Sequence, residues 1–251
     1  MNSILSVTEK LENSYTYHIF NRGINGTDLF LCQKDYEYFL HLYAKFIHPV
    51  ADSYAWVLLK NHFHFFLRIK DKEDIPYLRS FSSEFRSEVD MNITLTDPDL
   101  SGCEAADRVK TKSETNLTLT GLSTLSGQNE NRKKPNPSRQ FSHLFNAYAR
   151  YFNTRTGRHG GLFETPFKRI KVNNEKYFRN LVYYIHQNPV KHGFVDHILD
   201  WGWSSYLTMI SVKPTKLCRE TVLGYFDNAA NFKVYHHKQH DLREIEYMLL
   251  E

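Results

Sequence analysis

Hydrophobic residues recur along this chain with two spacings, and each spacing predicts a different kind of element. Apolar and polar positions that alternate with a period of two, in segments rich in aromatic and β-branched residues, predict strands. These segments are residues 15–20, 53–59, 61–69 and 167–172. Apolar residues three and four positions apart predict amphipathic helices. The helices are expected at residues 35–47, 75–88 and 140–153, and from Asn173 or Asn174 to the residues before Pro189.

The order of these elements indicates the fold class. Strand, helix, strand, strand, helix and strand follow one another, which matches a ferredoxin-like βαββαβ arrangement. We therefore expect an α+β fold, an antiparallel sheet with helices on one face, followed by the helix that Pro189 ends. Residues 1–210 would form this domain, and residues 211–251 a C-terminal helical tail with an amphipathic helix at 241–250.

The composition changes between about residues 90 and 139. This segment is rich in Ser, Thr, Asn, Gly and Asp and contains no aromatic residue. Such a segment cannot bury enough apolar surface to offset the entropy of ordering it. We expect an insertion that interrupts one helix or separates two.

Composition bounds the cellular setting. Hydrophobic residues make up 41% of the 251 residues, which supports a real core. Cys32, Cys103 and Cys218 are far apart, so they form neither a disulfide framework nor a zinc knuckle and fit a reducing compartment. The first residues lack the features of a signal peptide, and no stretch approaches a membrane span. We expect a cytoplasmic protein that does not bind a membrane.

Positive charge is concentrated in one region of the chain. The net charge is only +4, whereas residues 150–191 contain nine Lys or Arg against Glu164 and Glu175. Tyr, Phe and His residues are interleaved with these cations, which favours a polyanion such as nucleic acid as the partner. The alternative is a solvated, charged helix face.

Two histidines stand one residue apart on the predicted strand 61–69. Alternation places His62 and His64 on one face and a purely apolar set on the other, which belongs against a core. The two imidazoles start about 6.6 Å apart along the strand, and their rings can lean onto one metal ion. The alternative is a pair of satisfied polar residues without a ligand. No cysteine lies nearby in the sequence, so a structural zinc site lacks its usual ligands.

The last predicted helix carries a second candidate group. Tyr184 and Asn188 are four residues apart and therefore share a helix face. Tyr177, Leu181 and Tyr184 also form one stripe, so an aromatic core residue is the simpler interpretation of Tyr184. A reactive phenol becomes worth considering because of the amide one turn on and the basic surroundings. To attack a phosphodiester it needs an aligned phosphate, which a metal ion can supply.

Five motifs occur in order along the chain and together carry a resemblance. They are Tyr17-His18-Ile19-Phe20-Asn21-Arg22-Gly23, Asn61-His62-Phe63-His64, Gly160-Gly161-Leu162-Phe163 with Phe167-Lys168, Tyr184-Ile185-His186-Gln187-Asn188-Pro189-Val190-Lys191, and Trp203-Ser204-Ser205-Tyr206. This set resembles the single-tyrosine HUH transposases of the IS200/IS605-like superfamily, in particular the REP-associated tyrosine transposases. The resemblance covers about residues 15–206 apart from the insertion.

The resemblance implies a metal-dependent reaction on single-stranded DNA. By position in the motifs, His62 and His64 match the paired metal ligands, Asn188 a third ligand or orienting group, and Tyr184 the nucleophile. Relatives in the wider superfamily carry Gln at the Asn188 position, and Gln187 is a nearby alternative. The cofactor would be Mg²⁺ or Mn²⁺. The reaction would be nicking and joining of DNA by an endonuclease and strand transferase, through a 5′-phosphotyrosine intermediate.

The resemblance also gives the basic residues a role. They would contact DNA phosphates, and they are Arg150, Arg155, Arg158, Lys168, Arg169 and Lys171. Asn21 and Arg22 could read a base or hold the backbone, although a surface turn arginine is as good an interpretation of Arg22. Trp203 and Tyr206 could stack on bases, but a packing cluster with Trp201 and Leu207 is favoured.

Partners and competing functions follow from the same motifs. The expected partner is single-stranded DNA, as a hairpin or repeat sequence, and the protein would act as a monomer or a homodimer. A dimer could pair the tyrosine helix of one chain with the histidines of the other. The first alternative is a domesticated DNA hairpin-binding protein that does not cut. The second is a structural zinc or RNA-binding ferredoxin-like domain, which would carry stacking aromatics on an exposed sheet face.

Overall fold

The computed structural model describes residues 8–77 and 133–243 of the chain. The chain divides into two units, residues 1–76 with 135–251 and residues 77–134, and the elements below all belong to the first. Most of the predicted helix 75–88, of the insertion and of the helix 241–250 lies outside the described residues. Residues 137–139, at the expected end of the insertion, are already helical.

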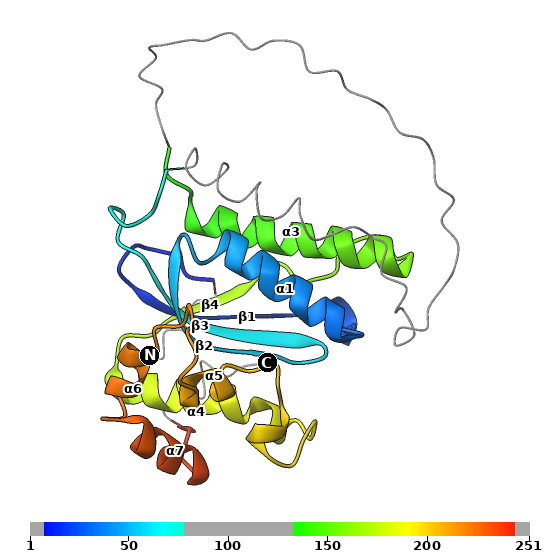
Figure 1. The fold of residues 1–251 in the computed structure, drawn as a ribbon. Coiled ribbons are helices and arrows are strands. Elements are labelled where there is room, and N and C mark those ends of the chain that lie inside the picture. The colour runs from blue at the N-terminus through cyan, green and yellow to red at the C-terminus, as the bar shows by residue number, and fades with distance from the viewer. Residues whose placement is uncertain (1–7, 78–132, 244–251) are drawn as a thin grey trace, which may run out of the picture. The chain divides into compact units, whose positions relative to one another are not determined.

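The centre of the first unit is a four-stranded antiparallel sheet (Figure 1). The strands are β1 (Thr16–Arg22), β2 (Ala51–Leu58), β3 (His62–Ile69) and β4 (Lys168–Lys171). Their order across the sheet is β2-β3-β1-β4, so the two central strands are the first and third in sequence. This is the expected ferredoxin-like arrangement, and the predicted α+β fold class is confirmed.

Two long helices cover one face of the sheet. They are α1 (Gln33–Phe46) and α3 (Pro137–Thr156), which lie side by side in Figure 1. The apolar side of β3, with Phe63 and Phe65, packs against Phe39 of α1 and Tyr148 of α3 in one hydrophobic cluster. The apolar face of the histidine strand therefore lies against a core, as alternation predicted.

The opposite face of the sheet is also covered, by helices that follow the βαββαβ elements in the chain and to which the sequence assigned no face. α4 (Glu175–Lys191) lies against β2 and β3, followed by α5 (Tyr206–Ile210), α6 (Arg219–Gly224) and α7 (Ala229–His237). Single turns of 3₁₀ helix occur at Ile24–Gly26 and Ile198–Asp200. Phe66, Leu181, Ile185 and Phe232 belong to one buried cluster on this side.

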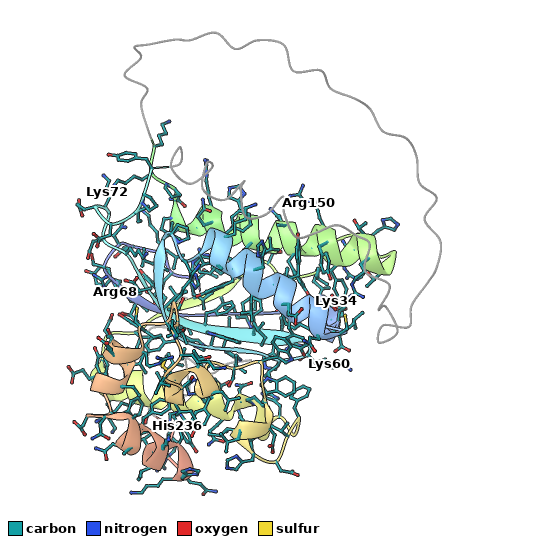
Figure 2. All side chains as sticks on the ribbon, viewed as in Figure 1. Lys34, Lys60, Arg68, Lys72, Arg150 and His236 are labelled. Carbon is teal, nitrogen blue, oxygen red and sulfur yellow. The ribbon has the colours of Figure 1, made fainter. Side chains whose placement is uncertain are left out.

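Side chains fill both layers, and His236 of α7 lies on the α4 side (Figure 2). Residues 211–243 thus belong to the same unit as the sheet, because α6 and α7 bury Val222 and Phe232. Among the helices of the described ranges, none has the length and hydropathy that crossing a membrane requires.

Helix α4 ends later than the sequence predicted. Its N-cap is Asn174, whose Oδ1 accepts a hydrogen bond of 2.8 Å from the backbone N of Lys176. Pro189 does not end the helix, which continues for two more residues to Lys191. The helix is closed instead around Gly193, which has a φ of +69°. Phe194 N donates to Pro189 O and Gly193 N to Val190 O, the two bonds of a Schellman motif.

Candidate active site

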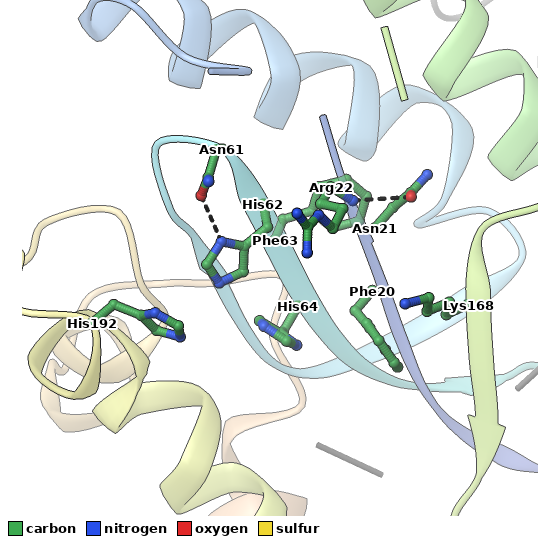
Figure 3. Close-up of a pocket in the computed structure, with 9 residues that line it drawn as sticks. All are labelled: Phe20, Asn21, Arg22, Asn61, His62, Phe63, His64, Lys168 and His192. Atoms are coloured by element: carbon green, nitrogen blue, oxygen red, sulfur yellow. Dashed lines mark hydrogen bonds between the residues drawn. The ribbon is translucent and has the colours of Figure 1, made fainter. Parts of the chain in front are cut away.

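The two histidines of β3 line a small cavity at the end of the sheet. The cavity measures about 140 Å³. Its lining comprises Phe20, Asn21, Arg22, Asn61, His62, Phe63, His64, Lys168 and His192, shown in Figure 3. The ring centroids of His62 and His64 are 5.3 Å apart. The predicted pair therefore faces a common space, on the side of the sheet that α4 covers.

The hydrogen bonds of His62 fix which of its nitrogens can bind a ligand. Its Nδ1 lies 2.8 Å from Asn61 Oδ1, an oxygen that only accepts, so Nδ1 carries the proton and Nε2 keeps a lone pair. That Nε2 lies 3.2 Å from Asn188 Oδ1. Two acceptor atoms at this separation are reconciled when a cation binds both, or when the amide turns so that its Nδ2 donates. Oδ1 of Asn188 thus lies where a third metal ligand beside His62 would be expected.

His64 is buried and electrically neutral. Burial lowers the pKa of His64 well below its usual value, and the nearby His18 and His62 lower it further. A neutral imidazole is the form that binds a metal ion. The Nδ1 of His64 lies 3.0 Å from Nε2 of His18 on β1.

The tyrosine helix lies against the histidine strand of the same chain. Tyr184 is 1% exposed, and its ring meets that of His64 edge-on with centroids 5.5 Å apart. Lys191, two turns further along α4, places its Nζ 5.0 Å from the centre of the Tyr184 ring. α4 thus presents a phenol, an amide and an ammonium group beside the two imidazoles.

The neighbours of Tyr184 and Asn188 in the sequence lie elsewhere. Tyr183 packs against Tyr235 and His240 in the C-terminal layer. Gln187 donates from Nε2 to the carbonyl oxygen of His236, at 2.9 Å. The geometry therefore favours Tyr184 over Tyr183 beside the histidines, and Asn188 over Gln187.

The Asn-Arg-Gly turn closes the cavity at the end of β1. Asn21 is buried, and its Nδ2 donates to the carbonyl oxygen of Glu164 at 3.0 Å. Arg22 pairs through Nε with Glu164 Oε1 at 3.2 Å and remains 43% exposed. A Cβ on Gly23 would stand 1.9 Å from the carbonyl oxygen of Thr27, which explains the glycine. Together with Lys168, Arg22 gives the cavity a positive rim.

A second, larger groove of about 700 Å³ begins on the other side of Asn21, which lines both spaces. It runs along α3 and the segment 160–167, and Arg150 and Arg169 are its cationic residues. The guanidinium of Arg169 lies over the ring of Phe167 at 4.6 Å. Arg150 is exposed. These two predicted DNA contacts are thus brought near the cavity.

The remaining predicted DNA contacts line neither space. Arg155 forms a 2.6 Å ion pair with Asp35, whose side chain is completely buried. Arg158 donates to Asn153 at 3.3 Å, and Lys171 pairs with Glu12 at 3.3 Å. Trp203 and Tyr206 both pack inside the protein, but not in one cluster with Trp201 and Leu207, because Trp203 belongs to the α1 side of the sheet and Leu207 is exposed. Trp203 stacks on Tyr36 with centroids 4.6 Å apart, and Tyr206 is 2% exposed in the core.

Three further residues of the site were not singled out from the sequence. They are His18, Lys191 and His192, whose ring lies 5.0 Å from that of His62. The signal for His18 was its even spacing from Phe20 and Arg22 on β1, which gives all three the same face. Lys191 and His192 directly follow the tyrosine motif, at the end of the same helix.

Comparisons with known proteins bear on this site. A scan against protein-family models found no match. Over 75 residues the chain is 32% identical to a putative REP-associated tyrosine transposase of Haemophilus influenzae, a match that covers 30% of this chain and 38% of that relative. A solved structure of a REP-associated tyrosine transposase bound to a REP hairpin matches with a TM-score of 0.50 at 16% identity, over 82% of this chain and 87% of that one. The second match shows a shared fold.

Proposed function

We propose that the chain is a REP-associated tyrosine transposase, like the relative and the solved structure that it resembles, and that it nicks and joins single-stranded DNA with a divalent metal ion and Tyr184 as nucleophile. The observation that carries the proposal is the meeting of two elements in one chain. Tyr184 packs on His64, while His62 Nε2 and Asn188 Oδ1 converge at 3.2 Å. A phenol beside a set of N and O ligands suits phosphoryl transfer.

The metal ligands would be Nε2 of His62, Nε2 of His64 and Oδ1 of Asn188. Two imidazoles and one amide fit Mn²⁺ well, and Mg²⁺ is the more oxygen-preferring alternative. Such an ion would polarise the scissile phosphate. Asn61 supports this set by holding His62 in the tautomer with a bare Nε2.

The reaction breaks one phosphodiester bond and forms another. Oη of Tyr184 attacks phosphorus and loses its proton, the bond from phosphorus to the 3′-oxygen breaks, and a 5′-phosphotyrosine and a 3′-hydroxyl result. The ammonium of Lys191 favours the negative charge that develops on the phenol. Because Tyr184 is 1% exposed, α4 or the cavity rim must shift to admit the phosphate. Attack by the 3′-hydroxyl of another strand reverses the step.

The DNA would lie over the positive rim and extend along α3. Arg22 and Lys168 line the catalytic cavity, and Arg150 and Arg169 line the adjoining groove. These four are the residues we propose for phosphate contacts, with Asn21 between the two spaces. A DNA hairpin or repeat is the proposed substrate, since the solved structure with the same fold is described as bound to a REP hairpin.

The decisive experiment incubates the protein with labelled single-stranded hairpin DNA, with and without Mn²⁺, and looks for a protein–DNA band that resists denaturation. The wild type should give this band with Mn²⁺, and Tyr184→Phe should abolish it while hairpin binding stays nearly unchanged. Tyr183→Phe is the matched control and should retain the band, because Tyr183 faces α7. An adduct in Tyr184→Phe would refute the assignment of the nucleophile.

A hairpin-binding protein that does not cut is the second candidate. It would bind the hairpin without forming the covalent band at any metal concentration. The preserved contact between Tyr184 and His64 favours the enzyme. His64→Ala separates the two functions further, because we expect it to lose metal-dependent cleavage and keep hairpin binding. Cleavage by His64→Ala in the presence of a chelator would exclude the metal mechanism.

A further inference from the structure

We propose that His18 is a positioning residue for the metal site: it accepts a hydrogen bond from Nδ1–H of His64 and thereby holds Nε2 of His64 ready for the metal ion. The role of His18 in holding a metal ligand rests on the proposed function. The His18–His64 hydrogen bond does not, because it is present without a metal ion. No role in the reaction was assigned to His18 from the sequence.

The sheet register brings the two histidines together. Phe20 of β1 pairs with His64 of β3, and His18 pairs with Phe66, so His18 and His64 are diagonal neighbours on the α4 face. Nε2 of His18 lies 3.0 Å from Nδ1 of His64, and the rings are nearly parallel, at 18° with centroids 5.2 Å apart. Both side chains are at most 1% exposed. The hydrogen bond between the two buried rings therefore couples their tautomers, since one nitrogen must donate and the other accept.

Only one direction of this hydrogen bond is compatible with a metal ion on His64. A neutral imidazole carries one proton. If His18 donated from Nε2, His64 would accept at Nδ1 and its own proton would sit on Nε2, where it would block ligation. If His18 accepts, the proton of His64 sits on Nδ1 and Nε2 keeps its lone pair. Metal-binding histidines commonly donate their other ring N–H to such a partner.

The same arrangement repeats the bond that orients His62. There Asn61 Oδ1 lies 2.8 Å from Nδ1, so Nδ1 carries the proton and Nε2 is unprotonated. His62 is thus oriented by its neighbour in sequence, and His64 by a residue of another strand. Two ligands with the same tautomer would then present Nε2 to the common cavity, which both line.

His18 also packs, so the test must separate its hydrogen bond from its shape. Its ring stacks on Phe20 with centroids 4.7 Å apart and meets Tyr184 edge-on at 6.5 Å. His18→Phe keeps a ring in this layer and removes the acceptor. His18→Gln restores an acceptor, because Oε1 of Gln is as many bonds from the backbone as Nε2 of His.

The experiment has a readout without metal and one with metal. Long-range proton–nitrogen NMR of the metal-free full chain, assigned with a His64→Gln variant, should show His64 as the Nδ1–H tautomer in the wild type and in His18→Gln. In His18→Phe this tautomer should no longer dominate. Mn²⁺ titration should show an affinity weakened about 10- to 100-fold in His18→Phe. It should stay within a few-fold of wild type in His18→Gln and in His41→Phe, a control on α1.

Two results would overturn the proposal independently of folding of the Phe variant. One is an Nε2–H tautomer of His64 in the wild type. The other is His18→Gln with a Mn²⁺ affinity as poor as that of a folded His18→Phe, which would show that ring shape and not the acceptor matters. If the wild type binds no Mn²⁺, the proposed function and the purpose of His18 both fail. If the wild type binds Mn²⁺ and His18→Phe binds it equally well, only the inference about His18 fails.

Discussion

At the scale of single residues, Asn188 is the proposed third ligand of the metal site. It is completely buried, and its Oδ1 lies 3.2 Å from the unprotonated Nε2 of His62. Asn188→Leu removes the oxygen at similar volume, whereas Asn188→Asp keeps an oxygen and adds a negative charge. We expect the Leu variant to bind Mn²⁺ at least about tenfold more weakly, since one ligand is lost.

The Asp variant should bind Mn²⁺ at least as tightly as the wild type, because carboxylates are stronger ligands for hard cations. Isothermal titration with Mn²⁺ measures both affinities. Gln187→Leu is the matched control next in sequence and should leave the affinity unchanged, as Gln187 bonds to His236. A loss in Gln187→Leu equal to that in Asn188→Leu would contradict the assignment of the ligand.

Residues whose placement depends on a local pattern could be predicted from the sequence. His62 with His64, and Tyr184 with Asn188, are related by the period of a strand and of a helix. His18 could not be predicted in the same way, because its partner lies 46 residues away and the β1–β3 register alone joins them. Arg155 was predicted as a phosphate contact from its basic surroundings. Its buried partner Asp35 lies 120 residues earlier, and nothing in the sequence links the two.

At the scale of elements, Ser205 connects strand β2 to helix α4 and, through His186 of α4, to helix α7. Its backbone N donates to Trp56 O, and its Oγ accepts from Trp56 N at 2.9 Å. The same Oγ lies 2.8 Å from Nε2 of His186 on α4. His236 of α7 donates from Nδ1 to Phe232 O, so His186 donates from Nδ1 to His236 and accepts from Ser205 at Nε2.

Ser205→Ala should therefore destabilise the protein. It removes the partner of the part-buried Trp56 N–H and of the buried His186 Nε2, and a buried polar group left without a partner costs about 1–3 kcal/mol. Chemical denaturation measures the free energy of unfolding. Ser204→Ala is the control in the same motif, because the Oγ of Ser204 accepts only a 3.3 Å bond from Tyr206 N, and its loss should be smaller. Equal losses in the two variants would refute the connecting role of Ser205.

The elements themselves could be predicted within a few residues wherever their periodicity is strong. β3 and α1 deviate by one or two residues from the predicted ranges. The end of α4 was missed because Pro189 is a strong local signal, while the Schellman closure at Gly193 depends on backbone geometry. α6 and α7 lie within the predicted helical tail, but their bounds were not predicted, since six- and nine-residue helices are too short to show a clear period.

At the scale of the whole molecule, the C-terminal layer changes how stability depends on pH. α7 brings His236 against His186, and both are buried. Burial lowers the pKa of His236 to about 4 and that of His186 well below its usual value. Burial lowers the pKa of His48 to about 4, and the charges of Lys216 and Lys70 lower it further. All three fold as neutral imidazoles.

The sign of the effect follows from proton uptake. Between pH 6.5 and about 4 the unfolded chain protonates these histidines while the folded protein does not, so stability falls as the pH falls. For His236 the loss between pH 7.5 and 5.0 amounts to about 2 kcal/mol, at 1.36 kcal/mol per pKa unit. Below about pH 4, His236 causes no further loss of stability, because it is protonated in both states. Above pH 7 it is neutral in both states, so it causes no loss.

Urea unfolding of the wild type and of His236→Gln at both pH values, with chelator present, tests this prediction. The Gln variant keeps an acceptor for His186 but cannot titrate, so its stability should fall by about 2 kcal/mol less between pH 7.5 and 5.0. His237→Gln, an exposed neighbour on the same helix, should keep the full wild-type difference. If His236→Gln loses as much stability on acidification as the wild type, the neutral His186–His236 pair is not what makes this layer sensitive to acid.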